Sequence, residues 1–291
     1  LLVGPPGCGK TLLASRLPGL LPDASEAEAL ESAAVQSVSG RGLDPTCWRT
    51  RPFRSPHHTA SAIALVGGGS EPRPGEISLA HNGVLFLDEL PEWDRRALEV
   101  LREPLESGLV TISRAARQSE FPARFQLVAA MNPCPCGWAG DISGRCRCSS
   151  DAITRYRARI SGPLLDRIDL HVDVPRLPPA ALRPDAPEGE SSGHIRQRVI
   201  DARQRQLDRA GVTNAALDQA ATARDCRLAP GDQALLERAI DALHLSARAM
   251  HRILRVARTI ADLDGQTSIA SIHLTEALTY RGASACDRVI N

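Results

Sequence analysis

A glycine-rich segment near the start of the chain has the residue types and the spacing of a phosphate-binding loop. Its residues are Gly4-Pro5-Pro6-Gly7-Cys8-Gly9-Lys10-Thr11, which fit G-x-x-x-x-G-K-[ST] at every fixed position. In such loops backbone N–H groups surround phosphate oxygens, the lysine reaches the terminal phosphates and the threonine hydroxyl can hold Mg²⁺. A helical pattern follows the loop, and a helix N-terminus favours the same anion. The segment therefore predicts a nucleoside triphosphate site with Mg²⁺ bound at Thr11.

Two carboxylates at the end of an apolar run supply the groups that phosphate hydrolysis needs. Residues 84–87 are all apolar and are followed by Asp88 and Glu89, which is typical of a central parallel strand with ligand-binding residues at its carboxyl end. Asp88 would hold Mg²⁺ through water, and Glu89 would orient and polarise the attacking water. Many strands end in a solvated acid, so this pattern indicates a hydrolytic site only in combination with the phosphate loop. A second apolar run, 125–131, ends at Asn132.

Four of the eight cysteines form a close group, Cys134-x-Cys136 and Cys146-x-Cys148. In an intracellular enzyme such clustering favours a metal site over disulfides. Four thiolates complete a tetrahedral structural Zn²⁺ site. The C-x-C spacing is, however, tighter than the usual C-x₂₋₄-C. A loop of reduced or redox-active thiols is therefore the alternative interpretation.

The composition limits the classes of protein to which the chain can belong. Its 291 residues carry a net charge of +1 and 3% aromatic side chains, so a nucleic-acid contact must be a local basic patch and a base-stacking platform is disfavoured. No apolar run approaches a membrane span in length and no signal peptide is visible, so we expect a cytoplasmic protein without a membrane partner. Because only Leu1-Leu2-Val3 precede the phosphate loop, where about five strand residues are usual, we expect a fragment of a longer protein.

The elements that must position these residues fall into two parts. Residues 1–175 predict an α/β nucleotide-binding core that includes the Cys-rich loop 134–148. The stretch 176–193 is rich in Pro, Gly and Ser and is interpreted as a linker. Residues 194–282 predict a helical domain, and 283–291 a tail. The four helical patterns of the domain at 194–282 lie near 195–202, 232–243, 246–260 and 272–278, with Asp232 and Ser246 as N-caps of the second and third helices.

Two further features carry charged or titratable side chains. Residues 110–121 alternate apolar and polar side chains around a basic tip with Arg114 and Arg117, which predicts a β-hairpin. A solvated turn without a binding role is the alternative for this tip. His57 and His58 would alternate faces in an extended chain, and no acidic residue is close to them in sequence. The sequence therefore assigns no role to this pair.

The order of these segments resembles that of AAA+ ATPases. The resemblance rests on the phosphate loop, on Gly-Glu-Ile-Ser-Leu-Ala-His-Asn-Gly-Val-Leu-Phe-Leu-Asp-Glu (75–89), on Asn132 and on Leu-Leu-Asp-Arg-Ile-Asp (164–169). Within the superfamily the chain is similar to the magnesium-chelatase-like group and to the YifB/ComM family. That closer likeness is carried by Arg51-Pro52-Phe53-Arg54-Ser55-Pro56-His57-His58 and by Asn132-Pro133-Cys134-Pro135-Cys136-Gly137.

The resemblance extends from residue 1 to about residue 282 and carries several structural expectations. It implies a P-loop parallel-sheet core with a C-terminal α-helical lid, and a homo-hexameric ring. ATP and Mg²⁺ are the cofactors that it implies. Family members also carry a Lon-like N-terminal domain, which is absent from this sequence.

The resemblance also assigns roles to three residues. Asn132 matches sensor 1, which helps to hold the attacking water against the γ-phosphate, and Arg248 matches sensor 2, from which an arginine bridges the lid to the γ-phosphate. A solvated arginine is the alternative for Arg248. Arg167 matches the arginine finger that is offered to the nucleotide of the neighbouring subunit. A structural ion pair with Asp166 or Asp169 is its alternative, and its role could be shared or taken by Arg155, Arg157 or Arg159.

The motifs and the resemblance together point to an ATP-driven machine. The resemblance implies a ring-forming motor on DNA that drives branch migration in recombination or natural transformation, with the hairpin arginines contacting phosphates of a threaded strand. The alternative is an ATPase subunit that remodels a protein partner, as in magnesium chelatase. A nucleotide-binding scaffold without activity is disfavoured because the groups for hydrolysis are all present, namely Lys10, Asp88, Glu89, Asn132 and Arg167.

Overall fold

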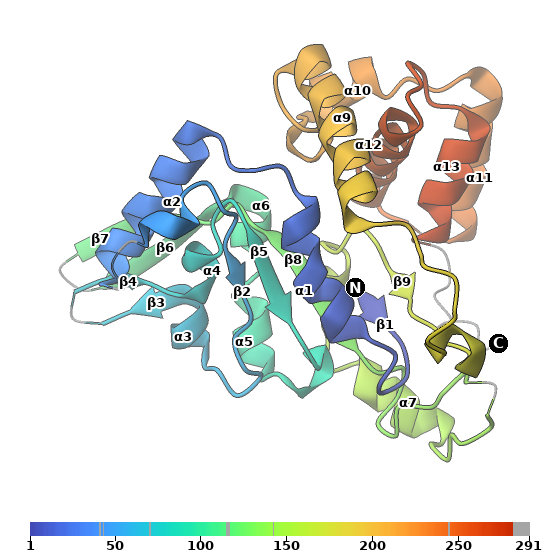
Figure 1. The fold of residues 1–291 in the computed structure, drawn as a ribbon, viewed down its shortest axis with the longest axis horizontal. Coiled ribbons are helices and arrows are strands. Elements are labelled where there is room, and N and C mark those ends of the chain that lie inside the picture. Colours follow the sequence, from blue (N-terminus) through green and yellow to red (C-terminus); the bar gives the residue numbers. More distant parts are fainter. Residues whose placement is uncertain are drawn as a thin grey trace. The chain divides into compact units, whose positions relative to one another are not determined.

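The computed structural model describes residues 1–40, 42, 44–69, 71–114, 117–141, 143–243 and 245–281. These residues form two compact units (Figure 1). The first contains Leu1–Ile168 and Asp173–Ala186, and the second contains Asp169–Val172 and the described residues between 187 and 281. In the part of the chain that is described, no helix has both the length and the apolar character needed to cross a membrane.

A five-stranded sheet with the order β2-β5-β8-β1-β9 forms the centre of the first unit. Its strands are β1 (Leu2–Val3), β2 (Phe53–Arg54), β5 (Val84–Leu87), β8 (Gln126–Met131) and β9 (Val172–Asp173). β2 pairs with β5, β5 with β8 and β8 with β1, all in parallel. The parallel α/β core predicted from the apolar runs is confirmed.

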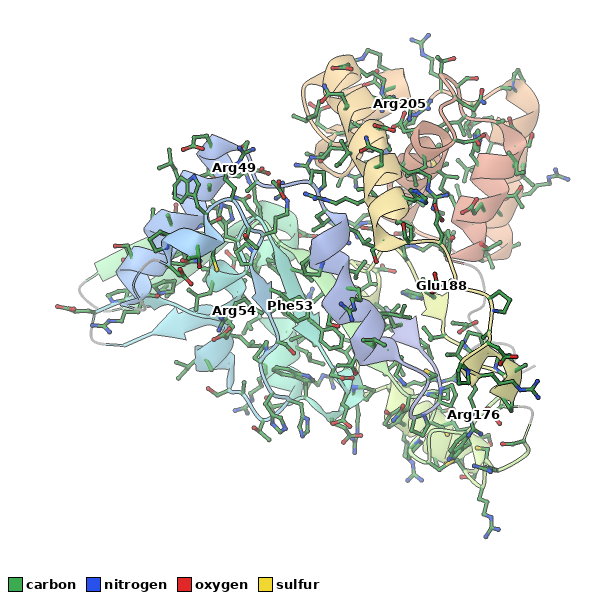
Figure 2. The ribbon with its side chains drawn as sticks, in the orientation of Figure 1. Arg49, Phe53, Arg54, Arg176, Glu188 and Arg205 are labelled. Atoms are coloured by element: carbon green, nitrogen blue, oxygen red, sulfur yellow. The ribbon has the colours of Figure 1, made fainter. Side chains whose placement is uncertain are left out.

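Strand β5 is buried on both faces, as its unbroken apolar run predicts. None of its four side chains is more than 1% exposed. Val84 and Phe86 pack with Ala14 of helix α1 (Lys10–Leu20) in one cluster, and Phe53 of β2 (Figure 2) stacks on Phe86 with ring centroids 6.2 Å apart. A fully buried strand therefore leads directly to Asp88 and Glu89.

The other helices of the first unit surround this sheet and are short, apart from α2 (Glu26–Ser39), which begins with a capping box between Ser25 and Glu28. They are α3 (Ala62–Val66), α4 (Glu76–Leu79), α5 (Arg95–Glu99), α6 (Pro104–Ser107), α7 (Ser150–Arg157) and α8 (Gly162–Leu165). Short 3₁₀ helices span Pro45–Cys47, Leu90–Glu92 and Pro179–Leu182. Strands β3 (Gly67–Gly68) and β4 (Arg73–Pro74) form a small antiparallel pair.

The predicted hairpin is confirmed. Strands β6 (Leu109–Arg114) and β7 (Arg117–Pro122) pair antiparallel from Leu109 opposite Pro122 to Arg114 opposite Arg117. Val110, Ile112 and Phe121 are buried, which explains the alternation seen in the sequence. The tip residues 115–116 and the side chains of the two arginines lie outside the described residues.

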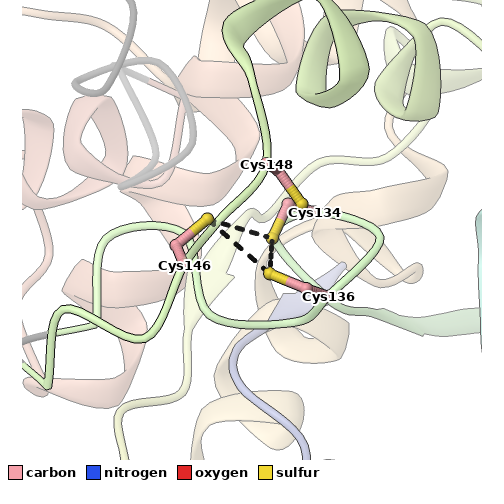
Figure 3. Close-up of side chains that lie close together, drawn as sticks. All are labelled: Cys134, Cys136, Cys146 and Cys148. Carbon is pink, nitrogen blue, oxygen red and sulfur yellow. Dashed lines mark hydrogen bonds between the residues drawn. The ribbon is translucent and has the colours of Figure 1, made fainter.

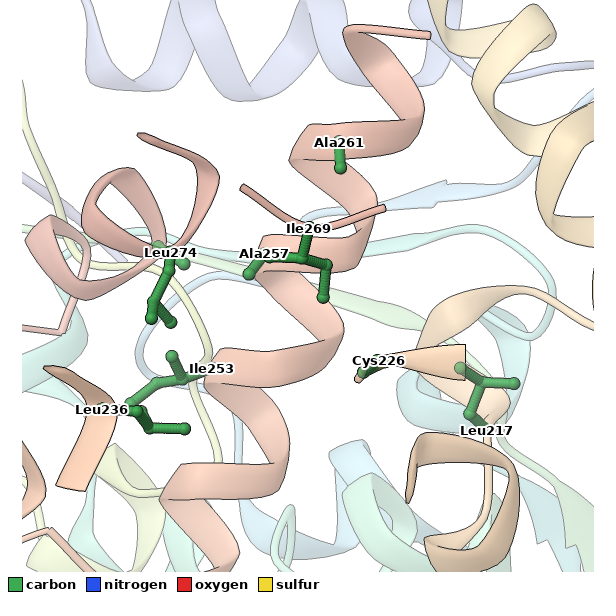
Figure 4. Close-up of a cluster of buried hydrophobic side chains, with 9 residues drawn as sticks. Leu217, Cys226, Leu236, Ile253, Ala257, Ala261, Ile269 and Leu274 are labelled. Atoms are coloured by element: carbon green, nitrogen blue, oxygen red, sulfur yellow. The ribbon is translucent and has the colours of Figure 1, made fainter. Parts of the chain in front are cut away.

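The second unit is helical. It contains α9 (Ser192–Ala210), α10 (Gln219–Asp225), α11 (Pro230–Ala242), α12 (Ala247–Leu263) and α13 (Ser271–Thr279), with a 3₁₀ turn at Asn214–Ala216. Its core gathers around α12 (Figure 4), where Ile253, Ala257 and Ala261 meet Leu236 of α11 and Leu274 of α13. The C-terminal helical region predicted from the sequence is confirmed.

Two details of this helical unit differ from the prediction. Its described residues hold five α-helices rather than four, because α10 was not predicted from the sequence. The prediction of Asp232 as an N-cap is wrong: α11 begins at Pro230 after Ala229, and Asp232 is buried in the first turn, where it accepts a hydrogen bond from the Ser271 hydroxyl. Ser246 does cap α12, accepting from the Ala249 N–H at 3.2 Å.

Candidate active site

The phosphate loop joins β1 to α1 and has the backbone that its glycines allow. Gly9 stands at the N-cap of α1 with φ 92°, a left-handed conformation that a side chain would disfavour. No side chain caps this helix end, so the first N–H groups of α1 are available to an anion. Residues Gly7 to Lys10 thus supply the backbone donors where the sequence predicted a phosphate-binding loop.

Lys10 is buried and links the loop to the neighbouring strand. Its Nζ donates to the carbonyl oxygens of Gly4 at 2.8 Å and Pro5 at 2.9 Å, and to Oδ1 of Asn132 at 3.2 Å. Because β1 and β8 are adjacent parallel strands, Asn132 at the end of β8 lies beside the loop that follows β1. The lysine and the predicted sensor 1 residue are therefore brought together.

Thr11, the residue after Lys10, contacts Asp88 at the end of β5. The Thr11 hydroxyl donates to Oδ2 of Asp88 at 2.6 Å, while Oδ1 of Asp88 accepts the N–H of Glu89 at 2.9 Å. A hydroxyl and a carboxylate side by side form an oxygen donor set that suits Mg²⁺, a cation held in nucleotide sites by one or two such groups, phosphates and water. The residues present thus fit the predicted metal.

A cavity of about 450 Å³ collects these groups. Pro6, Gly7, Gly9, Lys10, Thr11, Asp88, Glu89 and Asn132 line it together with Leu12 and Met131. Residues that the sequence singled out one by one therefore share a single site at the carboxyl edge of the sheet.

Glu89 has a partner that the sequence did not reveal. Its Oε2 lies 3.1 Å from Nδ1 of His58, and its backbone adopts the left-handed conformation with φ 51° and ψ 46°. His57 and His58 lie next to each other with ring centroids 4.2 Å apart. The motif at residues 51–58 was the only sequence signal for this contact.

Arg167 follows α8 and is held within the first unit. Its Nη2 lies 2.6 Å from Oε1 of Glu106, its Nη1 donates to the carbonyl oxygen of Pro163, and its side chain is 8% exposed. Asp169, one of the two acids considered from the sequence, pairs instead with Arg252 at 2.9 Å. Arg167 is absent from the residues that line the nucleotide cavity, so its role as an arginine finger stays a prediction.

The other arginines considered for this role have different surroundings. Arg157 donates to the carbonyl oxygen of Pro133 at 3.4 Å, and Arg159 pairs with Glu92 at 2.8 Å. Arg155 is exposed on α7. Arg248 lies in the first turn of α12 in the helical unit, so its role as sensor 2 also stays a prediction.

The four clustered cysteines lie together (Figure 3). The sulfur atoms of Cys134, Cys136, Cys146 and Cys148 all lie within 4.8 Å of one another. The Sγ atoms of Cys134 and Cys136 are 3.3 Å apart, which is well beyond the length of a disulfide bond. Although burial disfavours a thiolate, hydrogen bonds from the backbone N–H groups of Trp138 and Arg147 lower the pKa of Cys136 to about 6. Burial raises the pKa of the neighbouring Cys146 thiol to about 12. The fit to a tetrahedral zinc site therefore rests on the four converging sulfur atoms.

The cysteine loop borders the phosphate loop. It begins two residues after Asn132, and a Cβ added at Gly137 would lie 2.7 Å from Cδ of Pro6. Trp138 packs beneath the guanidinium groups of Arg145 and Arg176, which lie 5.1 and 5.7 Å from its ring centroid. The segment that carries the cysteine cluster therefore lies against the phosphate loop at Pro6.

Comparisons with known proteins agree with this geometry. The family model of magnesium chelatase subunit ChlI matches residues 1–182, and the model of the ChlI C-terminal region matches residues 189–281. The chain is 54% identical over 282 residues to competence protein ComM of Haemophilus influenzae, which covers 97% of this chain and 55% of that protein. It is 53% identical over 291 residues to YifB of Escherichia coli, and this match covers 100% of the present chain and 56% of YifB.

A more distant relative is the magnesium-chelatase 38 kDa subunit of Rhodobacter capsulatus, which is 26% identical over 306 residues, covering 97% of this chain and 79% of that subunit. The chain spans about half the length of the ComM and YifB relatives that it matches. The predicted resemblance to magnesium-chelatase-like and YifB/ComM proteins is confirmed. With its P-loop, parallel sheet and C-terminal helical region, the chain belongs to the magnesium chelatase ChlI family of AAA+ proteins.

Proposed function

We propose that this chain is the motor portion of an ATP-hydrolysing, ring-forming AAA+ protein that acts on DNA. The observation that carries the ATPase proposal is the convergence of Lys10, Thr11, Asp88, Glu89 and Asn132 around one cavity. Such a set supplies phosphate binding, a metal position and a base in one place. A site that only bound nucleotide would not need Glu89 at its edge.

The roles of these residues follow from their contacts. Lys10 donates to two carbonyl oxygens and to Asn132, and these donors would turn to the β- and γ-phosphates of ATP. Thr11 and Asp88 would hold Mg²⁺, which when bound neutralises negative charge on the phosphates. Glu89 would accept a hydrogen bond from the attacking water and polarise it, and Asn132 would fix that water from the other side.

A ring completes the site in this proposal. Arg167 would reach the γ-phosphate of the adjacent subunit and stabilise charge on the transferred group, an effect of about 10³–10⁵ in rate in other NTPases. To do so it must exchange its contact with Glu106 for the nucleotide. Arg248 would bridge the helical unit to the γ-phosphate as sensor 2. We propose a homo-hexamer, as the family resemblance implies.

The cysteine cluster is proposed as a structural zinc site. Cys134, Cys136, Cys146 and Cys148 would fill all four coordination positions, which leaves none for a reacting water and excludes a catalytic role for the metal. The ion would hold loop 134–148 closed against the phosphate loop. We also place the protein in the cytoplasm, where ATP is available and thiols stay reduced.

The proposed substrate is branched DNA. Support comes from the similarity to a competence protein and from the hairpin with Arg114 and Arg117 at facing positions, which would contact backbone phosphates without regard to sequence. Remodelling of a protein partner is the second candidate, favoured by the 26% identity to a magnesium-chelatase subunit over 97% of the chain.

ATPase assays on the full-length protein separate these candidates. Hydrolysis is measured alone and with single-stranded, duplex and four-way-junction DNA at matched nucleotide concentration. We expect the strongest stimulation with the junction, its loss in Arg114→Ala/Arg117→Ala, and its retention in Arg238→Ala, which removes an exposed arginine of α11. Unstimulated hydrolysis with all three DNAs would contradict the DNA proposal and favour the protein partner.

A further inference from the structure

Trp93 makes a contact that the ATPase proposal leaves unused. Its indole Nε1 donates a hydrogen bond to the backbone carbonyl oxygen of Asp88 at 2.9 Å, and the side chain is 4% exposed. This carbonyl belongs to the peptide bond between Asp88 and Glu89, the two residues proposed to hold Mg²⁺ and to polarise water. A buried indole N–H usually finds an acceptor, and here the acceptor lies between the two acids of the site.

The backbone at this peptide bond is strained. Glu89 has φ 51° and ψ 46°, a left-handed conformation that non-glycine residues seldom adopt. In the described part of the chain the other non-glycine residues with positive φ are Arg49 and Asn82, and neither lines the nucleotide cavity. Such a conformation costs free energy and persists only where the surrounding contacts hold it. The contacts that hold Glu89 are therefore part of what places its carboxylate.

Three hydrogen bonds among the described residues hold the turn that follows β5. The Glu89 N–H donates to Oδ1 of Asp88 at 2.9 Å, and the Glu89 carbonyl oxygen accepts from the Glu92 N–H at 2.7 Å. The third is the bond from the Trp93 indole. The first depends on a carboxylate that would also serve Mg²⁺, and the second fixes the carbonyl beyond Glu89. The indole bond fixes the plane of the 88–89 peptide, and the orientation of this plane sets φ of Glu89.

The indole is carried by a short element that is itself fixed. Trp93 directly follows the 3₁₀ helix Leu90–Glu92. Arg159 of α7 holds this helix, because its guanidinium pairs with Glu92 at 2.8 Å and donates to the carbonyl oxygen of Pro91 at 3.2 Å. A buried ring on a restrained element can act as a fixed reference for the peptide that it contacts.

We propose that Trp93 is the positioning residue of the peptide between Asp88 and Glu89, an inference that rests on the proposed ATP hydrolysis. Because one peptide bond joins both acids, its clamp aligns the carboxylate for Mg²⁺ and the carboxylate for water together. The indole bond uses neither carboxylate, so it persists when these groups turn to the metal and to water. Trp93 is not among the residues that line the nucleotide cavity and lines instead a neighbouring cavity of about 1090 Å³. It therefore acts through the backbone and not on ATP.

The test removes the indole N–H while keeping a ring of the same shape. In the full-length protein, residue 93 is replaced by 3-benzothienylalanine, in which sulfur takes the place of the N–H, and in parallel by phenylalanine (Trp93→Phe). We expect kcat of ATP hydrolysis to fall about 10- to 100-fold in both, because misplacing a reacting group by about 1 Å has effects of this size. ATP binding without Mg²⁺ should stay within about twofold of the wild type, since the donors of the phosphate loop are untouched. The matched control is Trp48→Phe, at a tryptophan that is 42% exposed, and its kcat should stay within about twofold.

The Mg²⁺ dependence of the same proteins separates positioning from a general structural effect. The Mg²⁺ concentration for half-maximal hydrolysis should rise in the benzothienylalanine protein, because Asp88 moves with the peptide. Thermal unfolding shows that each protein is folded at the assay temperature. An unchanged kcat or Mg²⁺ dependence in the benzothienylalanine protein, an equal loss in Trp48→Phe, or a loss of metal-free ATP binding as large as the loss of kcat overturns the proposal. Wild-type protein without ATPase activity would instead refute the proposed function itself.

Discussion

Replacing Asp262 by alanine should open the helical unit locally, and the size of the effect follows from its contacts. The Asp262 side chain on α12 is 1% exposed and accepts from Nη1 and Nη2 of Arg209 at 2.7 and 2.8 Å and from Nδ2 of Asn214 at 2.8 Å. Nη2 of Arg258, a side chain that is also 1% exposed, lies 3.1 Å away. Removing the carboxylate leaves one buried and one partly buried guanidinium without their counter-charge.

Breaking a buried ion pair in this way destabilises proteins by about 3–5 kcal/mol. We expect the lower end, about 3 kcal/mol, because Arg258 keeps the carbonyl oxygens of Gln266 and Thr267 and Arg209 reaches water. Since each 1.4 kcal/mol is tenfold in an equilibrium constant, amide exchange in α9 and α12 should accelerate by about two orders of magnitude.

Hydrogen exchange read by mass spectrometry measures this opening peptide by peptide. The matched control is Asp208→Ala, which removes an exposed carboxylate of α9 that accepts a hydrogen bond from Gln204 at 2.7 Å and should change stability by less than about 0.5 kcal/mol. Peptides of the sheet should exchange as in the wild type. Equal exchange of α12 in the two variants would refute the assigned importance of this buried network.

Three further predictions concern pH, metal and assembly. Burial raises the pKa of Asp262, but hydrogen bonds from Arg209 and Asn214 outweigh it and lower the pKa. The stabilisation by Asp262 is therefore complete above about pH 4 and is lost as pH falls through the lowered pKa. The free energy of unfolding should fall less steeply with falling pH in Asp262→Ala than in the wild type, and an equal slope would contradict the assignment. Purified protein should contain about one equivalent of zinc per chain, which Cys134→Ser/Cys136→Ser removes while ATP still binds; metal analysis without zinc in reduced, chelator-free protein would end this hypothesis. Arg167→Ala should bind ATP but hydrolyse it poorly, and mixing it with Lys10→Ala should restore part of the activity. The specific activity of the wild type should rise with protein concentration. A specific activity that stays constant on dilution of a proven monomer would exclude a trans-acting arginine.

The sequence predicted those parts of the fold whose signals are local. The phosphate loop needs a fixed order of glycine, lysine and threonine, and β5 needs an unbroken apolar run because both of its faces are covered. Ser246 was predicted as an N-cap because a serine before an apolar periodic segment is such a signal. The convergence of Lys10, Asp88 and Asn132 followed from parallel strands ending at one edge.

Features set by packing between distant segments could not be predicted. Helix α10 has the sequence Gln-Ala-Ala-Thr-Ala-Arg-Asp, which lacks an apolar stripe, and its place depends on contacts with α12. Asp232 has the residue type of an N-cap, yet Pro230 starts the helix earlier and leaves the acid to Ser271. The partners of Glu89 and Arg167 are 31 and 61 positions away in the chain, as the numbers of His58 and Glu106 show.

Nucleotide binding and turnover, measured on the same two variants of the full-length protein, test the central claim most directly. Lys10 contacts phosphates that are already present in bound ATP, whereas Glu89 acts on water only during the reaction. Lys10→Ala should therefore lose ATP binding, and Glu89→Gln should bind ATP as the wild type does while losing turnover. Affinities that fall equally in both variants, or hydrolysis that persists in Glu89→Gln, would contradict the proposed ATPase site.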